Sequence, residues 1–406
     1  MENFNFKILK KDKKTAARAG VISTRRGKIE TPYFVPVATL GSVRALNSDD
    51  LAALGAQCAL VNTYHLHLKP GDKTVKKLGG MHKFMNFEKP LFSDSGGFQA
   101  FSLGLAREHN IGKIGNFFPG ENGKKGLERP EINAKENLTR ITDEGIKFKS
   151  IYDGSWQFMD AKVSMKIQSN LDSDIIMAFD ECTSPLSDKE YTATAMRRTH
   201  DWAKLSLKYH NKKQALYGII QGGWFSDLRA ESTEFIGSLP FDGIAIGGSL
   251  GNCKHDMHQI LEWVIPRLDD RPRHLLGIGE VDDIFECVDR GIDTFDCVSP
   301  TRNARRGSLF LYPESGGRAK NKFRLHIASA KFREDKKPID PHCLCFTCQN
   351  HSRAYLSHLY HASELSYYRL ATIHNLHFML DLMAQVRASI KKGTFSALKK
   401  KWLGNL

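Results

Sequence analysis

The chain of 406 residues carries 59 lysines and arginines against 45 acidic residues, which gives a formal net charge of +14. This length excludes one small domain and suits one large α/β domain with an appendage. A balance this basic favours a polyanionic partner, nucleic acid first, although solubility alone also explains a basic surface.

Eight cysteines are present, and three of them are clustered at Cys343, Cys345 and Cys348. In a chain of this size that pattern is typical of a reducing compartment with a metal site, not of a disulfide framework. The N-terminus lacks the apolar segment of a secretory signal, and no run approaches the ~18 apolar residues that a membrane span needs. We therefore expect a cytoplasmic protein.

The first part of the chain, residues 1–30, is predicted to form an N-terminal β-hairpin. Polar and apolar residues alternate over residues 5–30, and Arg25-Arg26-Gly27 provides a turn. A different pattern then begins and extends to residue 306.

Eight short apolar runs follow, and amphipathic stretches separate most of them. The runs are Tyr33–Thr39, Cys58–His65, Pro90–Gly97, Asp174–Glu181, Ala215–Gly223, Gly243–Ser249, His274–Glu280 and Thr294–Pro300. Runs without alternation indicate strands buried on both faces, as in parallel sheets. Eight strand–helix units favour a (β/α)8 TIM-type barrel over residues 31–306. A doubly wound sheet is the alternative, but its dinucleotide-binding fingerprint is missing.

Polar residues and glycine fall at the C-terminal ends of these runs, namely Asp94, Asp180, Gln221, Gly248 and Asp296. In a barrel these ends meet at one mouth, where active sites are found. Residues 104–149, rich in Gly, Lys, Glu and Asn, interrupt the spacing. We expect an insertion at this mouth, with a short hairpin over Lys147–Gln157.

The region 307–406 is predicted to be a metal-binding subdomain with C-terminal helices. Cys343, Cys345 and Cys348 place three soft ligands on one loop, and three thiolates favour Zn²⁺ with a fourth ligand. His374 on the downstream helix is the preferred fourth ligand, and the alternatives are His377, His351 and His342. A closed set of this kind predicts one structural zinc ion per chain.

In the stretch Gly291–Arg306, an apolar run ends at Asp296, and a cluster of arginines follows. A carboxylate at a buried strand end can act as a nucleophile, and arginines beside it can hold phosphates. Taken alone, the same stretch also fits a strand-end cap followed by a solvated basic turn.

Several motifs, in order, resemble those of the tRNA-guanine transglycosylase family. The stretches that carry the resemblance are Asn62–Gly71, Ser93–Gln99, Met177–Cys182, Tyr217–Gly222, Ile246–Gly248, Gly291–Cys297 and the Cys-x-Cys-x-x-Cys…His set. The resemblance covers nearly the whole chain outside residues 104–145. It implies a (β/α)8 barrel with a zinc subdomain, usually a homodimer. The implied reaction exchanges the wobble guanine of tRNA for a 7-deazaguanine base, 7-aminomethyl-7-deazaguanine or queuine, in queuosine biosynthesis or salvage.

The same resemblance assigns roles to individual residues. Asp296 would attack the ribose anomeric carbon, and Asp94 would be the general acid–base. The base pocket would comprise Ser95, Gly96, Gly97, Phe98, Asp180, Gln221, Gly247, Gly248, Leu276 and Gly277. The RNA contacts would comprise Gly277, Ile278, Gly279, Glu280, Val281, Asp282, Asp283, Thr301, Arg302, Asn303, Ala304 and Arg305. Single-stranded RNA at the anticodon loop would allow the target base to be splayed into this pocket.

Two departures from the family's pattern stand out. The loop after Gly248 lacks a glutamate that bacterial members carry, and Gly251 stands near the usual valine. The smaller residue and the missing carboxylate would make room for a bulkier substituent. We therefore hypothesise that queuine is used as well as, or instead of, 7-aminomethyl-7-deazaguanine. Glu280 replaces the lysine of a Gly-Lys-Pro motif and reverses a charge in a loop that would face RNA.

Two other classes of function are alternatives to an enzyme that modifies tRNA. A zinc-stabilised tRNA-binding subunit without catalytic activity would be expected to lose the nucleophile or the zinc ligands, and neither is lost here. A metal-dependent barrel hydrolase would need ligands at strand ends, and His65 with His274 do not form a recognisable set.

Overall fold

The structure, a computed structural model, describes residues 4–100 and 139–404. The chain divides into two compact units, and each is described by itself. The first comprises Met1–Phe4, Thr24–Arg26 and Val61–His274, and the second comprises Asn5–Ser23, Gly27–Leu60 and Leu275–Leu406. Most of the predicted insertion, residues 104–138, lies outside the described residues.

The predicted fold class is confirmed by a nine-stranded parallel sheet in the order β4-β15-β14-β13-β12-β11-β7-β6-β5. Its strands are β4 (Tyr33–Val35), β5 (Val37–Ala38), β6 (Ala59–Val61), β7 (Leu91–Ser93), β11 (Ile175–Met177), β12 (Ala215–Ile220), β13 (Gly243–Ile246), β14 (Arg273–Leu275) and β15 (Thr294–Asp296). The predicted run Tyr33–Thr39 supplies both β4 and β5, because Pro36 between them has no N–H for a ladder hydrogen bond. β4 and β5 are the first and last strands in the order of the sheet, yet they follow one another in the chain. The sheet therefore nearly closes.

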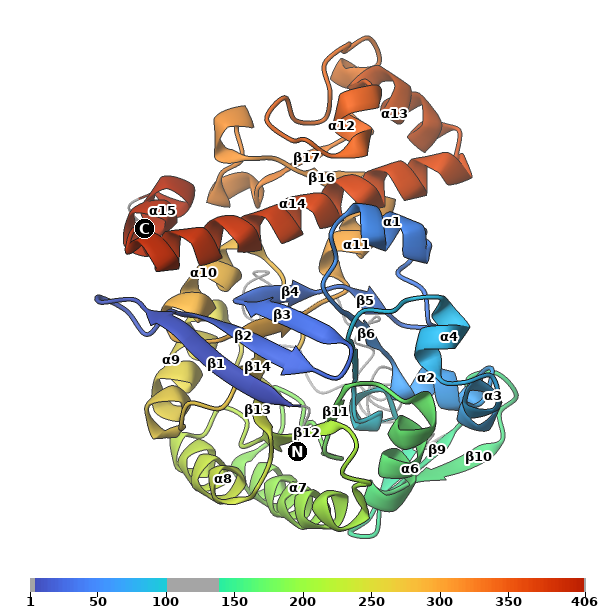
Figure 1. Ribbon diagram of the computed structural model, residues 1–406, viewed down its shortest axis with the longest axis vertical. Helices are drawn as coiled ribbons and strands as arrows, with labels where there is room; N and C mark the ends of the chain where they lie inside the picture. Colours follow the sequence, from blue (N-terminus) through green and yellow to red (C-terminus); the bar gives the residue numbers. More distant parts are fainter. Residues whose placement is uncertain (1–3, 101–138, 405–406) are drawn as a thin grey trace. The chain divides into compact units, whose positions relative to one another are not determined.

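The first unit holds the middle of this sheet. Every residue of β11, β12 and β13 is buried, which explains why these strands read as continuous apolar runs. Figure 1 shows α7 and α8 beside this part of the sheet, and both pack against β12. The helices of the unit are α2 (Thr63–Leu68), α3 (Asp72–Lys77), α4 (Met81–Met85), α6 (Ala161–Leu171), α7 (Lys189–Tyr209), α8 (Ser226–Ser238), α9 (Lys254–Val264) and the 3-10 turn η2 (Ile265–Arg267).

A small antiparallel sheet also belongs to the first unit. It consists of β8 (Thr139–Ile141), β9 (Ile146–Lys149) and β10 (Trp156–Met159), in the order β10-β9-β8. The pairing of Trp156 with Lys149 and of Phe158 with Lys147 confirms the hairpin predicted over Lys147–Gln157.

The second unit begins with an antiparallel sheet of β1 (Asn5–Lys11), β2 (Arg18–Thr24) and β3 (Gly27–Thr31). The residues predicted as a hairpin thus supply three strands. Arg18 is 2% exposed, and its Nε donates to Asp293 Oδ1 over 2.9 Å. This buried ion pair fixes the chain just ahead of β15, whose last residue is Asp296.

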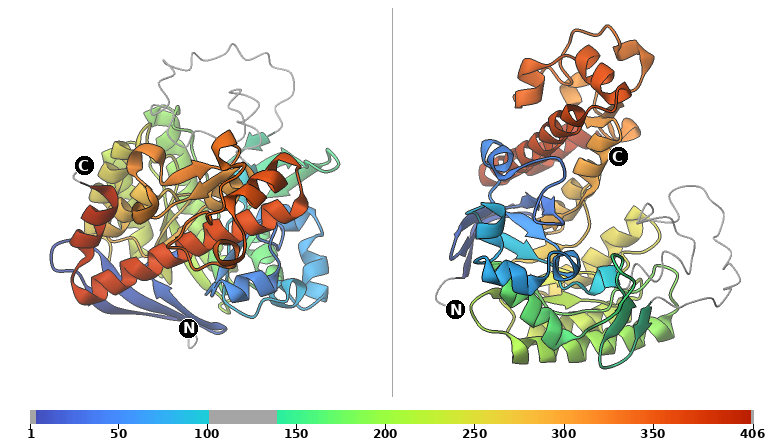
Figure 2. Two further views of the ribbon diagram at one scale, coloured as in Figure 1. Left: turned by 90° about the horizontal axis from the view of Figure 1, so that it is seen from above. Right: turned by 90° about the vertical axis from the view of Figure 1, so that its right-hand side faces the viewer.

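The rest of the second unit is organised around the long helix α14 (Leu365–Lys392). Figures 1 and 2 show α14 with β4 on one side and with β16, β17, α12 and α13 on the other. The remaining elements are α1 (Ser48–Ala53), α10 (Val281–Asp289), α11 (Ser299–Arg305), β16 (Ser308–Phe310), η3 (Pro313–Ser315), η4 (Ala319–Asn321), β17 (Arg324–His326), η5 (Ala330–Phe332), α12 (Phe346–Asn350), α13 (Arg353–His361) and α15 (Phe395–Leu403). In the described residues, no helix is both long and apolar enough to cross a membrane.

Candidate functional site

Three strand ends of the first unit meet at a buried carboxylate. Asp180, which follows β11, accepts a hydrogen bond from Ser95 Oγ over 2.6 Å and from Gln221 Nε2 over 2.8 Å. Ser95 follows β7 and Gln221 follows β12, and none of the three side chains is more than 4% exposed. The sequence predicted that these residues would converge, and the structure brings them into direct contact.

The environment of Asp180 shifts its proton affinity. Burial raises the pKa of this carboxyl to about 6, while the hydrogen bonds from Ser95 and Gln221 work in the opposite direction. Asp180 is therefore mostly a carboxylate at neutral pH and gains a proton under mildly acidic conditions. A buried carboxylate of this kind can accept hydrogen bonds from the N–H groups of a planar ligand.

Two glycines allow the backbone to lie close to this cluster. A Cβ on Gly97 would stand 2.4 Å from the backbone oxygen of Asp180. Gly248 has a φ of +76°, and a Cβ there would stand 2.2 Å from Gln221 Oε1. Gln221 Oε1 is itself buried and has no hydrogen-bond partner. Any side chain at either glycine would therefore displace the groups around Asp180.

Asp94 lies at the end of β7 and is held by the start of α2. The backbone N–H of Thr63 donates to Asp94 Oδ1 over 2.8 Å, and Asn62 Nδ2 donates to Oδ2. Asn62 also caps α2, because its Oδ1 accepts from the N–H of His65 over 2.9 Å. These contacts orient a partly exposed carboxylate at a strand end.

Arg229 on α8 is a residue of this site that the sequence analysis missed. It is fully buried and donates to three backbone carbonyls: Nε to Gly223 over 2.8 Å, Nη1 to Ile220 over 3.2 Å and Nη2 to Ser249 over 2.9 Å. Burial lowers the pKa of its guanidinium to about 10. Arg229 thereby joins the loop of Gln221 to the loop of Gly248. No motif marks it, since an arginine in an amphipathic helix is usually solvated.

The loop after Gly248 lies close to α9. A Cβ on Gly251 would stand 2.2 Å from Asp256 Cβ, and the φ of Gly251 is +91°. Asp256 also accepts from the backbone N–H of Asn252 over 2.7 Å. The close approach of α9 therefore gives a structural reason for a glycine at this position, and room for a larger substituent stays a prediction.

Asp296, in the second unit, ends β15 and is partly exposed. The backbone N–H of Gly277 donates to Asp296 Oδ1 over 3.3 Å. Leu276 and Gly277 form the turn after β14 and are also partly exposed. The second unit thus joins two of the predicted site segments, the strand-end carboxylate and the Leu276–Gly277 turn.

Arginine side chains gather on and around α11. The pKa of Arg305 is lowered by burial and then by the charges of Arg44, Arg302 and Arg306. Arg44 was not among the predicted residues, because it lies far from the others in the sequence. Four like charges that act on one another form a local positive field suited to phosphates.

The segment predicted to face RNA, Gly277–Asp283, is largely turned inward. Ile278, Val281 and Asp283 are at most 3% exposed. Glu280 forms an ion pair with Arg324 and accepts from Ser299 Oγ over 2.9 Å. The negative charge of Glu280, which stands where the family motif has a lysine, is therefore neutralised within this unit.

The predicted metal ligands lie together in the second unit. The ligand atoms of Cys343, Cys345, Cys348 and His374 are all within 4.8 Å of one another, and all four residues are buried. His374 Nε2 lies 2.8 Å from the carbonyl oxygen of Phe310, which orients Nδ1 toward the sulfurs. Among the described residues this is the one cluster of three or more such ligands.

The helix that carries His374 also supports the arginine helix. Asn375 Nδ2 donates to the carbonyl oxygens of Pro300 over 2.9 Å and Ser308 over 3.0 Å. The hydroxyl of Tyr367 donates to the carbonyl of Ala304 over 2.9 Å. Order at the cysteine cluster is therefore coupled to the position of α11.

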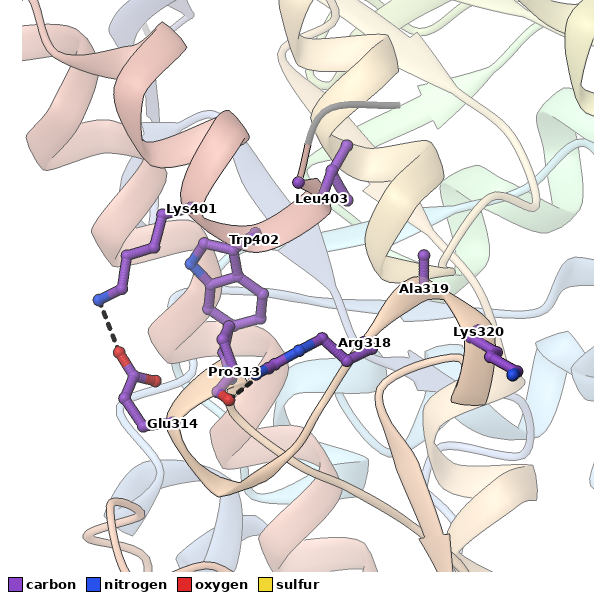
Figure 3. A pocket seen from close by; sticks show the side chains of 9 residues that line it. Pro313, Glu314, Arg318, Ala319, Lys320, Lys401, Trp402 and Leu403 are labelled. Carbon is purple, nitrogen blue, oxygen red and sulfur yellow. Dashed lines mark hydrogen bonds and ion pairs between the residues drawn. The ribbon is translucent and has the colours of Figure 1, made fainter.

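A hollow of about 530 Å³ lies between η3, η4 and α15, and Figure 3 shows its lining. Lys401 pairs with Glu314 over 2.6 Å, and Arg318 Nη1 donates to the carbonyl of Gly317 over 2.7 Å. None of the predicted site residues lines it, and Glu314, Arg318 and Lys401 have local partners. We assign it no function.

Comparison with known proteins agrees with the motifs. A family profile described as "Queuine tRNA-ribosyltransferase" matches residues 12–132 and 122–406. A "Putative queuine tRNA-ribosyltransferase" of Archaeoglobus fulgidus is 52% identical over 388 residues, which cover 95% of this chain and 96% of that protein. The "Queuine tRNA-ribosyltransferase" of Roseiflexus sp. is 42% identical over 413 residues, which cover 98% and 99%. The chain therefore belongs to the queuine tRNA-ribosyltransferase family.

Proposed function

We propose that the chain exchanges guanine at the wobble position of tRNA for a 7-deazaguanine base, as a tRNA-guanine transglycosylase. The observation that carries this proposal is the buried Asp180, with Ser95 and Gln221 hydrogen-bonded to its two oxygens. Such a group matches the N–H edge of guanine, and the family match covers residues 12–406.

In this proposal Asp296 is the nucleophile. Its carboxylate forms a bond to the anomeric carbon of the ribose while the bond to the guanine nitrogen breaks, and Asp94 gives that nitrogen a proton. The incoming base loses a proton to Asp94 and displaces Asp296, so two inversions retain the configuration. The Asn62 and Thr63 donors support the role of Asp94, because they fix the direction of its oxygens.

The base would be recognised by its edge and its face. The oxygens of Asp180 would accept from the ring N–H and the exocyclic amine. The second N–H of Gln221 Nε2 and the backbone N–H of Gly248 would donate to the carbonyl oxygen, and Phe98 would stack on the ring. Ser95, Gly96 and Gly97 would bring the backbone close to the base.

The cysteine cluster would hold zinc. Three thiolates and one imidazole are the donor set of closed, tetrahedral structural zinc sites. When bound, the ion would link the loop of Cys343–Cys348 to α14. It would have no open position for a substrate, because three cysteines and one histidine would fill all four tetrahedral positions.

The test of the nucleophile is base exchange with the Asp296→Asn variant. Labelled guanine should enter tRNA with the wild type, while the variant should lose activity by at least about 10³-fold and keep its affinity for tRNA. Wild-type protein and tRNA should also form an adduct that survives denaturation. Normal turnover by the variant would eliminate Asp296 as the nucleophile.

The alternative of a non-catalytic tRNA-binding subunit is disfavoured by the presence of both Asp94 and Asp296. The loop after Gly248 lacks the glutamate that bacterial members of the family carry. For this reason the proposal includes queuine, besides 7-aminomethyl-7-deazaguanine, as a base that the enzyme uses. Competition between the two bases tests this, and a clear preference for the aminomethyl base would reject queuine as the substrate.

We also propose that the chain works in the cytoplasm as a homodimer. Leu344, Phe346 and Tyr355, around the cysteine cluster, are 73%, 51% and 43% exposed. Apolar groups exposed this close together are typical of a protein interface. Sedimentation should give twice the chain mass, and Phe346→Ser should shift it toward the monomer.

A further inference from the structure

We propose that the exposed face of the β8–β9–β10 sheet is a second RNA-binding surface, on which an unpaired tRNA base stacks against Trp156 while basic side chains hold the adjoining phosphates. The basic side chains are Arg140, Lys147 and Lys149. The inference rests on the proposed function only in taking tRNA as the partner. None of these residues is among the predicted anticodon contacts.

The strand register places these residues on one face. Trp156 is opposite Lys149, and Phe158 is opposite Lys147. On the other side of β9, Arg140 is opposite Lys147. Side chains in paired positions of an antiparallel sheet point to the same side. The opposite face, with Ile146, Phe148 and Met159, is buried.

The geometry of the face is that of an aromatic ring surrounded by cations. Lys147 Nζ lies 5.2 Å, Lys149 Nζ 5.5 Å and Arg140 Cζ 6.0 Å from the centroid of the Trp156 ring. Trp156 and Phe158 are 41% and 46% exposed. A tryptophan that only filled the core would be covered by protein, and this one is not.

The turn between β9 and β10 also exposes apolar side chains. Ile151 and Tyr152 are 49% and 45% exposed. Lys69 Nζ lies 5.6 Å from the centroid of the Tyr152 ring. A second exposed aromatic ring next to the sheet is therefore paired with a cation.

The positive charge of this face favours a nucleic acid as the partner. No residue of the three described strands is acidic, so the outward side chains are cationic or aromatic. The nearby acids lie in the turns, and one of them, Asp143, pairs with Arg198 over 3.0 Å. Proteins that hold single-stranded nucleic acid combine such cations with exposed rings, because every base has a face that can stack. A protein partner would have to supply a strongly acidic patch.

The first test compares the Trp156→Ala variant with the wild type in binding full-length substrate tRNA. Stacking of one base is worth about 1–3 kcal/mol, so the dissociation constant should rise about 5- to 150-fold. The KM for tRNA should rise in parallel, while kcat at saturating tRNA should stay unchanged. Trp156→Phe should restore most of the affinity, since it keeps a ring at this position.

A second variant tests the cations. Lys147→Ser combined with Lys149→Ser should lower the slope of log Kd against log salt concentration by about 1.4 to 1.8, as expected for two phosphate contacts. The matched control is Tyr209→Ala on α7. Tyr209 is 39% exposed, with Lys162 Nζ 5.5 Å and Lys208 Nζ 5.8 Å from its ring centroid. It has the same pairing of ring and cations on a helix, and its loss should leave tRNA binding unchanged.

Unchanged tRNA affinity and salt dependence in both sheet variants would overturn the proposal, as would an equal loss in the Tyr209 control. A change of sedimentation in the sheet variants without a change in tRNA affinity would also overturn it, because it would identify a protein contact. If the wild type itself fails to exchange guanine yet loses tRNA affinity on Trp156→Ala, the proposed function fails and this surface stands.

Discussion

The buried cluster around Asp180 and the arginines around α11 differ in their physics, and in the proposed function they serve two different kinds of recognition. In the first, a single buried carboxylate is satisfied by short hydrogen bonds and enclosed by backbone at Gly97 and Gly248. In the second, several cations repel one another at the end of a helix. Buried hydrogen bonds discriminate strongly between ligands, because a wrong ligand leaves them unpaired. Clustered cations give affinity for any phosphate chain.

The difference predicts that damage to the two regions will separate in the assay. Changes around Asp180 should reduce base exchange and leave tRNA affinity unchanged. Changes at α11 should reduce tRNA affinity and leave base exchange unchanged. The cysteine cluster should behave as part of the α11 region, because Asn375, next to His374, holds the carbonyl of Pro300.

The largest effect is expected from the Cys345→Ser variant. Loss of one of four buried ligands should prevent binding of the proposed zinc ion, and structural zinc is worth about 10–16 kcal/mol in small zinc domains. We expect metal content near zero, a lower melting temperature and weaker tRNA binding through the loosened α11. Cys287→Ser, another fully buried thiol, is the control and should keep its metal. Full metal content with an unchanged melting curve in Cys345→Ser would contradict the assignment.

A smaller but more specific effect is expected from Asp180→Asn. An amide nitrogen in place of one oxygen would face the donors of Ser95 or Gln221, and the N–H edge of guanine would lose an acceptor. We expect kcat/KM for base exchange to fall about 10²- to 10³-fold, with tRNA affinity retained. The exposed Asp201→Asn should have no effect. A loss of tRNA affinity equal to the loss of exchange would remove the contrast between the two regions.

The same residue predicts a pH dependence. The pKa of Asp180 is raised from 3.8 to about 6, so folding favours its protonated form. Its contribution to the free energy of unfolding is therefore present below about pH 3.8 and is lost as the pH rises through about 6. In the proposed function the base binds to the carboxylate form, so kcat/KM should decline below about pH 6, and Asp180→Asn should abolish that limb of the profile.

The fold could be predicted from the sequence because strands buried on both faces are apolar throughout, and this signal is local. The convergence of Asp180 and Gln221 followed from strand ends alone, whereas Ser95 was predicted through the family resemblance. Arg229, Arg44 and the partners of Glu280 could not be predicted, because each depends on a contact between segments far apart in the chain. The structural reason for Gly251 could not be predicted either, because the residue that requires a glycine there, Asp256, belongs to the following helix.

An intermediate effect is expected at Arg229. It tests whether the hydrogen bonds from Arg229 to backbone carbonyls hold the loops of Gln221 and Gly248 in place. Arg229→Met removes three donors to the loops of Gln221 and Gly248, and unpaired buried carbonyls cost about 1–3 kcal/mol. We expect the KM for guanine to rise about 10- to 100-fold while the pH profile keeps its shape, because Asp180 is untouched. Arg229→Lys, which keeps one cationic donor, should recover part of the loss. Exchange kinetics over a range of guanine concentrations measure both.

The smallest effect is expected from Arg302→Ala, and it tests the other half of the contrast. One phosphate contact contributes about one unit to the slope of log Kd against log salt concentration. The variant should therefore bind tRNA about 5- to 10-fold more weakly at low salt, with a slope reduced by about 1 and with the KM for guanine unchanged. Arg267→Ala, which removes an exposed arginine of the first unit, should leave both quantities as they are. If Arg302→Ala instead raised the KM for guanine at constant salt slope, the arginine helix would belong to the base pocket. The division between discrimination by buried hydrogen bonds and affinity by clustered charge would then not hold in this protein.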